Sequence, residues 1–204
     1  MIDAYVDGRP ISRRNLLDRD LPRDIERMLG AHGLPAPALQ LEITESMIMS
    51  DPERALATVK RLSDLGVRLS VDDFGTGYSS LANLRRLPID ELKIDRSFVS
   101  PMLQDESDLI IVRSTINLGH DLGLKIIAEG VEDAPTLERL ATLGCDLAQG
   151  FHLSRPLAAT AFDEWLADTP VPGETEPAPG PLPTPLAAEW TTATSGVVVA
   201  SPAP

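Results

Sequence analysis

The chain has 204 residues, of which 43% are hydrophobic and 24% charged, a composition typical of a soluble globular protein. The formal net charge of -13 argues against a protein that binds the DNA or RNA backbone, and the single cysteine, Cys145, excludes a disulfide framework and a cysteine-rich zinc site. No apolar run has the length of a membrane span, and residues 1–7 do not resemble a secretion signal. We therefore expect a cytoplasmic protein that binds no membrane.

The first element that the sequence predicts is a strand over residues 39–45, whereas residues 1–10 stay unplaced. A helix is predicted over residues 51–65. Asp51 is its expected N-cap, Pro52 stands in its first turn, and apolar residues recur on one face.

One pattern then repeats along the chain: a helix ends at a Leu-Gly or Leu-Pro pair, and a short apolar strand follows. The predicted strands after these pairs cover residues 67–71, 89–94, 124–128 and 145–148. A second long helix is expected over residues 107–121. Because helices alternate with strands, the sequence predicts parallel strands joined by right-handed crossovers, which is an α/β fold.

Polar side chains stand where each predicted strand ends. In chain order these are Glu42 and Glu45, Asp72 and Asp73, Lys93 and Asp95, Glu129 and Glu132, and Gln149. Because the carboxyl ends of parallel strands meet on one face, we expect these residues to form one pocket. Its oxygen ligands, with no His or Cys among them, favour Mg²⁺ or Mn²⁺ over zinc.

Asp72 and Asp73 are the most informative pair in this set, because they follow an apolar strand directly into a glycine-containing turn. Neighbouring ionised carboxylates repel one another, which predicts a divalent metal or a buried positive charge beside them. Lys93 is expected to point away from the side of Leu92 and Ile94, to a face where carboxylates keep it charged.

Simpler interpretations compete at the other positions. A single acidic residue after a strand, such as Glu45 or Glu132, can be a helix cap or a solvated loop residue. Lys93 can belong to a plain structural ion pair, and Gln149 can cap the following turn. His120 and His152 stand at isolated positions and His32 lies in a glycine-rich loop, so none of them is assigned a catalytic role.

The composition changes near the carboxyl terminus. Half of the 18 prolines follow Thr169, and no Lys or Arg follows Arg155. Such a segment buries too little apolar surface to order itself. Residues 168–204 are therefore predicted to form a disordered, Pro/Ala-rich tail, and a role in peptide recognition is the alternative.

Taken together, the strand-end motifs resemble the EAL domain, the bacterial phosphodiesterase module for the second messenger cyclic di-GMP. The matching segments are residues 41–46, 72–81, 87–98, 128–132 and 148–151, with Ser154-Arg155-Pro156 after them. The resemblance runs over residues 11–167. It implies an incomplete (β/α)8 TIM-like barrel in which about five βα units are retained.

The resemblance also implies roles for single residues. Glu42, Asp72 and Asp73 fall on positions that bind two divalent metals, and Glu129 falls on a position assigned as metal ligand or general base. Lys93 matches the lysine that positions the attacking water.

Other positions match residues that bind the substrate or hold the loop over residues 74–80. These are Glu45, which matches the loop-anchoring glutamate, Gln149, which matches a pocket glutamine, and Asp95 and Glu132. The implied reaction is hydrolysis of cyclic di-GMP to linear pGpG, in which Mg²⁺ or Mn²⁺ activates water and stabilises charge on the phosphate.

The chain departs from the family at its front. No Glu-Ala-Leu motif is present, although the family's metal-binding glutamate lies in it, and Pro10-Ile11-Ser12 stands where the family has Asn-(Leu or Val)-Ser. We therefore expect an amino-terminally truncated domain with an incomplete two-metal site and weak or no activity by itself.

Two alternatives to a phosphodiesterase are considered, and the missing motif motivates the first. The chain can be a catalytically inactive cyclic di-GMP-binding or protein-interaction module in second-messenger signalling, with a homodimer or a complementing chain as partner. A third hypothesis, in which Lys93 acts as a base beside Mg²⁺ as in enolase-like barrels, fits the loop over residues 72–81 poorly.

Overall fold

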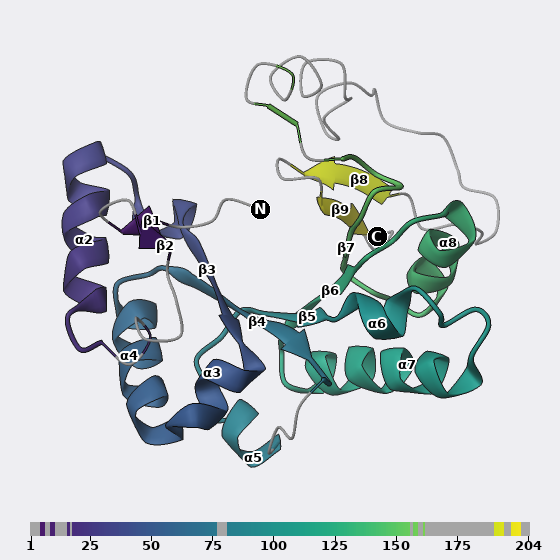
Figure 1. Cartoon of the computed structure of the whole chain (residues 1–204), viewed down its shortest axis with the longest axis horizontal. Helices are drawn as coiled ribbons and strands as arrows, with labels where there is room; N and C mark the ends of the chain where they lie inside the picture. The colour runs from purple at the N-terminus through teal and green to yellow at the C-terminus, as the bar shows by residue number, and fades with distance from the viewer. Residues whose placement is uncertain are drawn as a thin grey trace, which may run out of the picture. The chain divides into compact units, whose positions relative to one another are not determined.

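Figure 1 shows the computed structural model, which describes residues 5–6, 9–10, 16, 18–76, 81–155, 157–158, 161, 190–193 and 197–200. The chain divides into two compact units, one formed by residues 1–95 and 118–125 and the other by residues 96–117 and 126–204. Each unit contains parallel strands and helices. In the described part of the chain, no helix is both long and apolar enough to cross a membrane.

The first unit contains a parallel sheet with the strand order β3 (Gln40–Thr44), β4 (Arg68–Phe74) and β5 (Glu91–Ile94). Leu41 lies opposite Leu69 and Val71 lies opposite Leu92, and all four side chains are buried. Because successive side chains point to opposite faces, one face of this sheet is apolar and the other is polar. The polar face carries Gln40 and Glu42 from β3, Ser70 and Asp72 from β4, and Glu91 and Lys93 from β5.

The helices of the first unit are α2 (Leu21–His32), η1 (Ala36–Ala38), α3 (Glu45–Ser50), α4 (Pro52–Asp64) and α5 (Leu81–Leu84). The prediction for α4 is confirmed. The Asp51 side chain accepts a hydrogen bond from the Arg54 backbone N–H at 3.2 Å, which caps the first turn, and Pro52 opens the helix. Val59 and Leu62 lie on its buried face.

Helix α2 has no counterpart among the elements that the sequence predicts. Pro22 stands in its first turn, and Gly33 ends it in the left-handed conformation with φ of 62°. Leu21 and Ile25 are buried. Figure 1 shows α2 beside α4, and the two helices are in contact. A short antiparallel pair, β1 (Tyr5–Val6) and β2 (Arg9–Pro10), precedes α2.

The elements from α6 onward are α6 (Arg96–Val99), α7 (Glu106–Asp121), β6 (Lys125–Glu129), α8 (Ala134–Thr142), β7 (Leu147–Gln149), β8 (Trp190–Ala193) and β9 (Val197–Ala200). Strand β6 pairs with β7 in parallel, and β9 pairs antiparallel with both β7 and β8. The sequence predicts no regular structure over residues 168–204, whereas the structure has β8 and β9 there. The remaining residues of that range lie outside the described ones.

Two aspartates, each just before a strand, accept a hydrogen bond from the start of a preceding strand. The Asp90 carboxylate, just before β5, accepts a hydrogen bond from the Leu69 N–H of β4 at 2.8 Å, and the Asp90 N–H donates to the Leu69 carbonyl at 2.9 Å. The Asp146 carboxylate, just before β7, accepts a hydrogen bond from the Ile126 N–H of β6 at 2.8 Å. Hydrogen bonds to charged groups contribute about 1.5–3 kcal/mol each, so these aspartates fix the pairing of successive strands.

Candidate active site

Asp72 and Asp73 lie in a β-bulge at the end of β4. Val71 pairs with Leu92 and Phe74 pairs with Ile94. Between these two pairs, β4 advances by three residues and β5 by two, so β4 contains one extra residue. Asp73 adopts the left-handed conformation with φ of 56°, and it is the one non-glycine residue with positive φ in the described part of the chain. Aspartate tolerates this region better than most residues, and a bulge re-aims the side chains of its strand.

Hydrogen bonds hold the turn that follows this bulge. The Asp73 N–H donates to the Asp72 carboxylate at 3.0 Å, and the Thr76 hydroxyl donates to the Asp73 carbonyl at 2.9 Å. The Gly75 N–H donates to the Glu45 carboxylate at 3.1 Å. Glu45, in the first turn of α3, is 2% exposed, so a buried carboxylate fastens the turn to the end of β3.

This contact fits the loop-anchoring role that the family resemblance gives Glu45. The second oxygen of the Glu45 carboxylate is buried and has no hydrogen-bond partner among the described residues. Residues 77–80 lie outside the described ones.

Lys93 brings the three strands of the first unit together at one point. Its side chain is 1% exposed. The ammonium nitrogen Nζ lies 2.9 Å from Glu42 Oε1 on β3 and 3.3 Å from Asp72 Oδ1 on β4. A buried lysine is stable only when acidic partners compensate for its lost hydration, and here two strands supply one carboxylate each.

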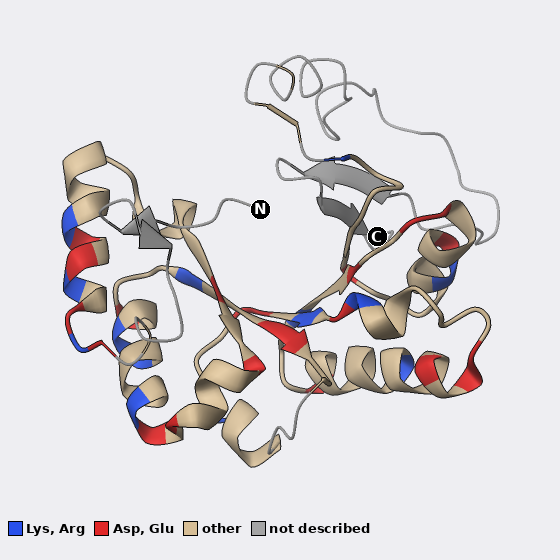
Figure 2. Cartoon of the chain, in the orientation of Figure 1, with Lys and Arg blue, Asp and Glu red and all other residues tan. Residues whose placement is uncertain are grey.

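The surroundings of this ion pair carry more negative than positive charge. Burial raises the pKa of the Asp73 carboxyl above its usual value, and nearby carboxylates raise it further. These carboxylates belong to Asp72, Asp95 and Glu42, and the charge of Lys93 acts in the opposite direction. Figure 2 shows acidic residues on the ribbon where β4 ends. An added cation would therefore be favoured at this end of the sheet.

The residues present fit a divalent cation in charge and donor chemistry, because carboxylate oxygens are the ligands that Mg²⁺ and Mn²⁺ prefer. Their arrangement is less complete. Over the described ranges, no three Asp, Glu, His or Cys side chains are grouped so that they could hold one metal ion together. The ammonium of Lys93 lies within ion-pair distance of both Glu42 and Asp72.

The remaining predicted residues of the site belong to the second unit. Glu129 ends β6 and lies opposite Gln149, which ends β7. The two segments stay joined beyond the strands, because the Val131 N–H donates to the Gln149 carbonyl at 3.1 Å. Glu132 is exposed and lies just before Asp133, the N-cap of α8. The structure thus brings Glu42, Asp72, Asp73 and Lys93 together in one unit and Glu129 and Gln149 together in the other.

Sequence reasoning missed a buried polar layer in the strand interiors of the first unit. The Gln40 side-chain amide donates to the Glu91 carboxylate at 2.6 Å, and Glu91 is buried. Ser70 lies opposite both Glu42 and Glu91, and its buried hydroxyl has no hydrogen-bond partner among the described residues. The signal was strand alternation, which places these residues on the face of Glu42 and Lys93.

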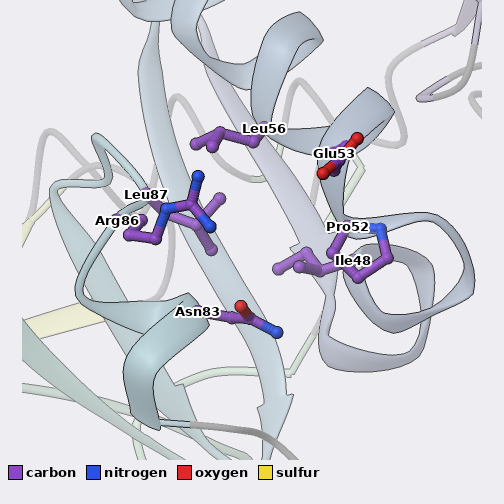
Figure 3. A pocket seen from close by; sticks show the side chains of 7 residues that line it. All are labelled: Ile48, Pro52, Glu53, Leu56, Asn83, Arg86 and Leu87. Atoms are coloured by element: carbon purple, nitrogen blue, oxygen red, sulfur yellow. The ribbon is translucent and has the colours of Figure 1, made fainter.

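A separate small hollow lies in the helix layer of the first unit (Figure 3). Its lining residues are Ile48, Pro52, Glu53, Leu56, Asn83, Arg86 and Leu87. They come from α3, α4 and the segment around α5, and none of the strand-end carboxylates is among them. We therefore place the candidate active site at the strand ends and not in this hollow.

Comparison with known proteins identifies the family. The family model for the EAL domain matches residues 9–156. The chain is 44% identical over 152 residues to the cyclic di-GMP phosphodiesterase NbdA of Pseudomonas aeruginosa, a match that covers 74% of this chain and 19% of that protein. It is 48% identical over 135 residues to the bifunctional diguanylate cyclase/cyclic di-GMP phosphodiesterase MucR of the same organism, covering 66% of this chain and 20% of that protein. The chain thus spans about a fifth of the length of these relatives.

Solved structures agree with this assignment. The Pseudomonas aeruginosa MucR phosphodiesterase in complex with c-di-GMP matches with a TM-score of 0.72 and 44% identity, over 74% of this chain and 61% of that one. The EAL domain of Mycobacterium smegmatis DcpA matches with a TM-score of 0.73 and 41% identity, over 79% of this chain and 73% of that one. The expected α/β class with an incomplete TIM-like barrel is confirmed, and the chain belongs to the EAL domain family.

Proposed function

We propose that this chain binds cyclic di-GMP and carries part of the site that hydrolyses it to linear pGpG. The observation that carries the proposal is the buried Lys93 ammonium, fixed between Glu42 and Asp72 beside a bulge that presents a second aspartate. Relatives of this chain are named as cyclic di-GMP phosphodiesterases. The setting is the bacterial cytoplasm, where the dinucleotide acts as a signal.

The cofactor in this proposal is Mg²⁺ or Mn²⁺. Glu42, Asp72 and Asp73 would hold it in the first unit, and Glu129 is the further candidate ligand. A divalent cation supplies Lewis acidity, which stabilises the negative charge that develops on the phosphate during hydrolysis.

The residues of the chain would perform the rest of the reaction. Lys93 is desolvated and held in one place, so its ammonium can orient the attacking water and donate hydrogen bonds to a phosphate oxygen. Glu129 would accept the proton of that water as general base. A new P–O bond forms to the water oxygen while the bond to the 3′ oxygen breaks, and the departing oxygen takes up a proton from solvent.

Gln149 and Glu45 serve this reaction without touching the reacting atoms. The Gln149 amide, opposite Glu129, can hydrogen-bond a base edge. Glu45 keeps the turn after β4 in place through Gly75. Because no Glu-Ala-Leu motif contributes a ligand, turnover by this chain is expected to be lower than that of intact sites by orders of magnitude.

The direct test is incubation of the purified chain with cyclic di-GMP and Mg²⁺ or Mn²⁺, followed by chromatography for pGpG. Product that is lost in Asp72→Asn but kept in Glu53→Gln, an exposed position on α4, would support the proposal. Absence of both product and calorimetric binding of the dinucleotide would overturn it.

A second candidate function is a catalytically inactive cyclic di-GMP-binding or protein-interaction module. It is favoured by one specific observation: over the described ranges, no three acidic or histidine side chains are grouped around a common metal position. Dinucleotide binding without turnover, at any Mg²⁺ or Mn²⁺ concentration, would select this function. Size-exclusion chromatography with light scattering would show whether a homodimer forms, and a complementing chain is the other partner considered.

A further inference from the structure

Two side-chain bridges cross β4 on the polar face of the first unit. In the first, the Gln40 amide of β3 donates to the Glu91 carboxylate of β5 at 2.6 Å. In the second, the Lys93 ammonium of β5 lies 2.9 Å from the Glu42 carboxylate of β3. Both bridges join β3 to β5, although β4 lies between these strands (Figure 1). Neighbouring strands are about 4.8 Å apart, so each bridge spans roughly twice that distance at the level of the backbone.

Ser70 on β4 stands between the two bridges. In the pairing of the strands it lies opposite Glu42 on one side and Glu91 on the other. Gln40 lies two residues before Glu42, so the first bridge crosses β4 on the amino-terminal side of Ser70. Lys93 lies two residues after Glu91, so the second bridge crosses on the carboxyl-terminal side. Ser70 is fully buried and its hydroxyl has no hydrogen-bond partner among the described residues, so it contributes its small size and not a bond.

The first bridge affects the second because Glu91 and Lys93 share one face of β5. They stand two residues apart, and both are buried. A buried carboxylate is costly unless hydrogen bonds replace its lost hydration, and a lysine ammonium offers three N–H donors. The Gln40 amide supplies Glu91 with a donor from another strand. The ammonium is then available to Glu42 and Asp72, toward the carboxyl ends of the strands.

We propose that Gln40 and Ser70 are positioning residues that set where the Lys93 ammonium lies. Gln40 satisfies the Glu91 carboxylate, which would otherwise compete for the ammonium. Ser70 leaves the space through which both bridges pass. Neither residue touches the reacting atoms. The inference rests on the proposed function only for the use of Lys93 in the reaction, because the position of the ammonium is measurable without turnover.

Lysine-selective ¹⁵N NMR of the whole chain measures this position directly. The chain has three lysines, Lys60, Lys93 and Lys125, and Lys93 alone among them is buried. Its Nζ signal should therefore differ from the other two, and its ammonium protons should exchange more slowly with water. Glu42→Gln alters a direct partner of the ammonium, so it should shift the signal and serves as the positive control.

Gln40→Met keeps the length of the side chain but removes the donor. We expect it to shift the Lys93 signal and to speed exchange of the ammonium protons by about 10-fold or more, because Glu91 then competes for the ammonium. The double variant Gln40→Met/Glu91→Met removes the competing carboxylate as well, so the signal should return to its original place. Ser70→Ala should leave the signal unchanged, whereas Ser70→Val crowds both bridges and should shift it.

Val59→Ala is the matched control, because it removes a fully buried apolar side chain from α4 and not from the polar face of the sheet. It should leave the Lys93 signal in place, whatever its effect on unfolding in urea. An unchanged signal in Gln40→Met would overturn the proposal, as would a double variant that does not restore the signal. A shift of equal size in Val59→Ala would overturn it as well. Absence of both product and dinucleotide binding would overturn the proposed function, whereas the NMR signal decides the position of the ammonium in either case.

Discussion

The ammonium nitrogen of Lys93 lies 2.9 Å from the carboxylate of Glu42, and the lysine is almost completely buried while the glutamate is about one-third exposed, with 35% of its side-chain surface accessible. The two partners therefore differ in what they lose when the pair is broken. Without its partner, Lys93 would keep a charge in a place that water hardly reaches, whereas Glu42 could still be hydrated.

We expect Lys93→Ala to destabilise the chain by about 1–3 kcal/mol, because it leaves Glu42 and Asp72 facing each other without a cation. Any phosphodiesterase activity should fall by at least about 100-fold, since a charged group positioned at the phosphate is lost. Urea unfolding measures the first effect and product chromatography the second. Arg27→Ala, which removes an exposed ion pair with Asp24, is the control and should cost less than about 1 kcal/mol. Equal losses in both variants would contradict the assigned role.

Removal of the Glu45 carboxylate should loosen the turn after β4 selectively. Glu45→Ala deletes the acceptor of the Gly75 N–H, and hydrogen exchange of that amide should become about 10-fold faster or more, which corresponds to one lost hydrogen bond of at least about 1.4 kcal/mol. Glu45→Gln retains a carbonyl oxygen as acceptor and should protect the amide better. Exchange at Ala55, buried within α4, should not change in either variant. An unaltered rate at Gly75 in Glu45→Ala would refute the anchoring role.

The acid limb of the stability curve should depend on Asp133. Hydrogen bonds from Thr136 lower the pKa of the Asp133 carboxyl, and the charge of His152 lowers it further. Because the pKa in the folded state lies below that in the unfolded state, the carboxylate stabilises the fold above pH of about 3.9 and loses this effect as the pH falls through the lowered pKa. Asp133→Asn keeps an N-cap oxygen without the charge, so its stability should vary less between pH 5 and about pH 2. Thermal unfolding followed by circular dichroism at several pH values measures the difference, and parallel curves for both proteins would exclude this effect.

Two glycine-to-alanine substitutions should change stability in opposite directions. Gly150→Ala forces a Cβ atom against the Val131 carbonyl at 2.1 Å, and we expect a loss of at least about 2 kcal/mol. Gly30→Ala lies inside α2, where nothing stands within 4 Å of the new Cβ, and it should raise stability by about 0.5–1 kcal/mol. Midpoints of urea unfolding give both values. If Gly150→Ala were as stable as the unaltered chain, the backbone of Gly150 could not lie so close to the Val131 carbonyl.

Much of the fold could be predicted because its signals are local. The Leu-Gly pairs and the apolar runs after them predicted parallel strands, and Asp51 and Pro52 marked the start of α4. The alternation of side chains placed Lys93 on the face opposite Leu92 and Ile94, where the structure has Glu42 and Asp72. Helix α2 carries similar signals in Pro22, in its first turn, and in Gly33, at its end.

Other features could not be predicted because they depend on partners that are distant in the sequence. The bulge at Asp72 and Asp73 breaks the two-residue period on which strand reasoning relies, and only its pairing with β5 reveals it. Strands β8 and β9 contain several β-branched residues, but their place is set by β7, about 50 residues earlier in the chain. The contact of Gln40 with Glu91 likewise joins residues that are 51 positions apart.

The aspartates that precede β5 and β7 also bear on how the chain is made. The Leu69 N–H donates to a carboxylate 21 positions later in the chain, and the Ile126 N–H donates to one 20 positions later. During synthesis from the amino terminus, the Leu69 and Ile126 amides therefore lack these hydrogen-bond acceptors until Asp90 and Asp146 have left the ribosome. A fragment that ends between Ile126 and Asp146 would lack the acceptor of the Ile126 amide. Boundaries of recombinant fragments should therefore lie after such an aspartate and not before it.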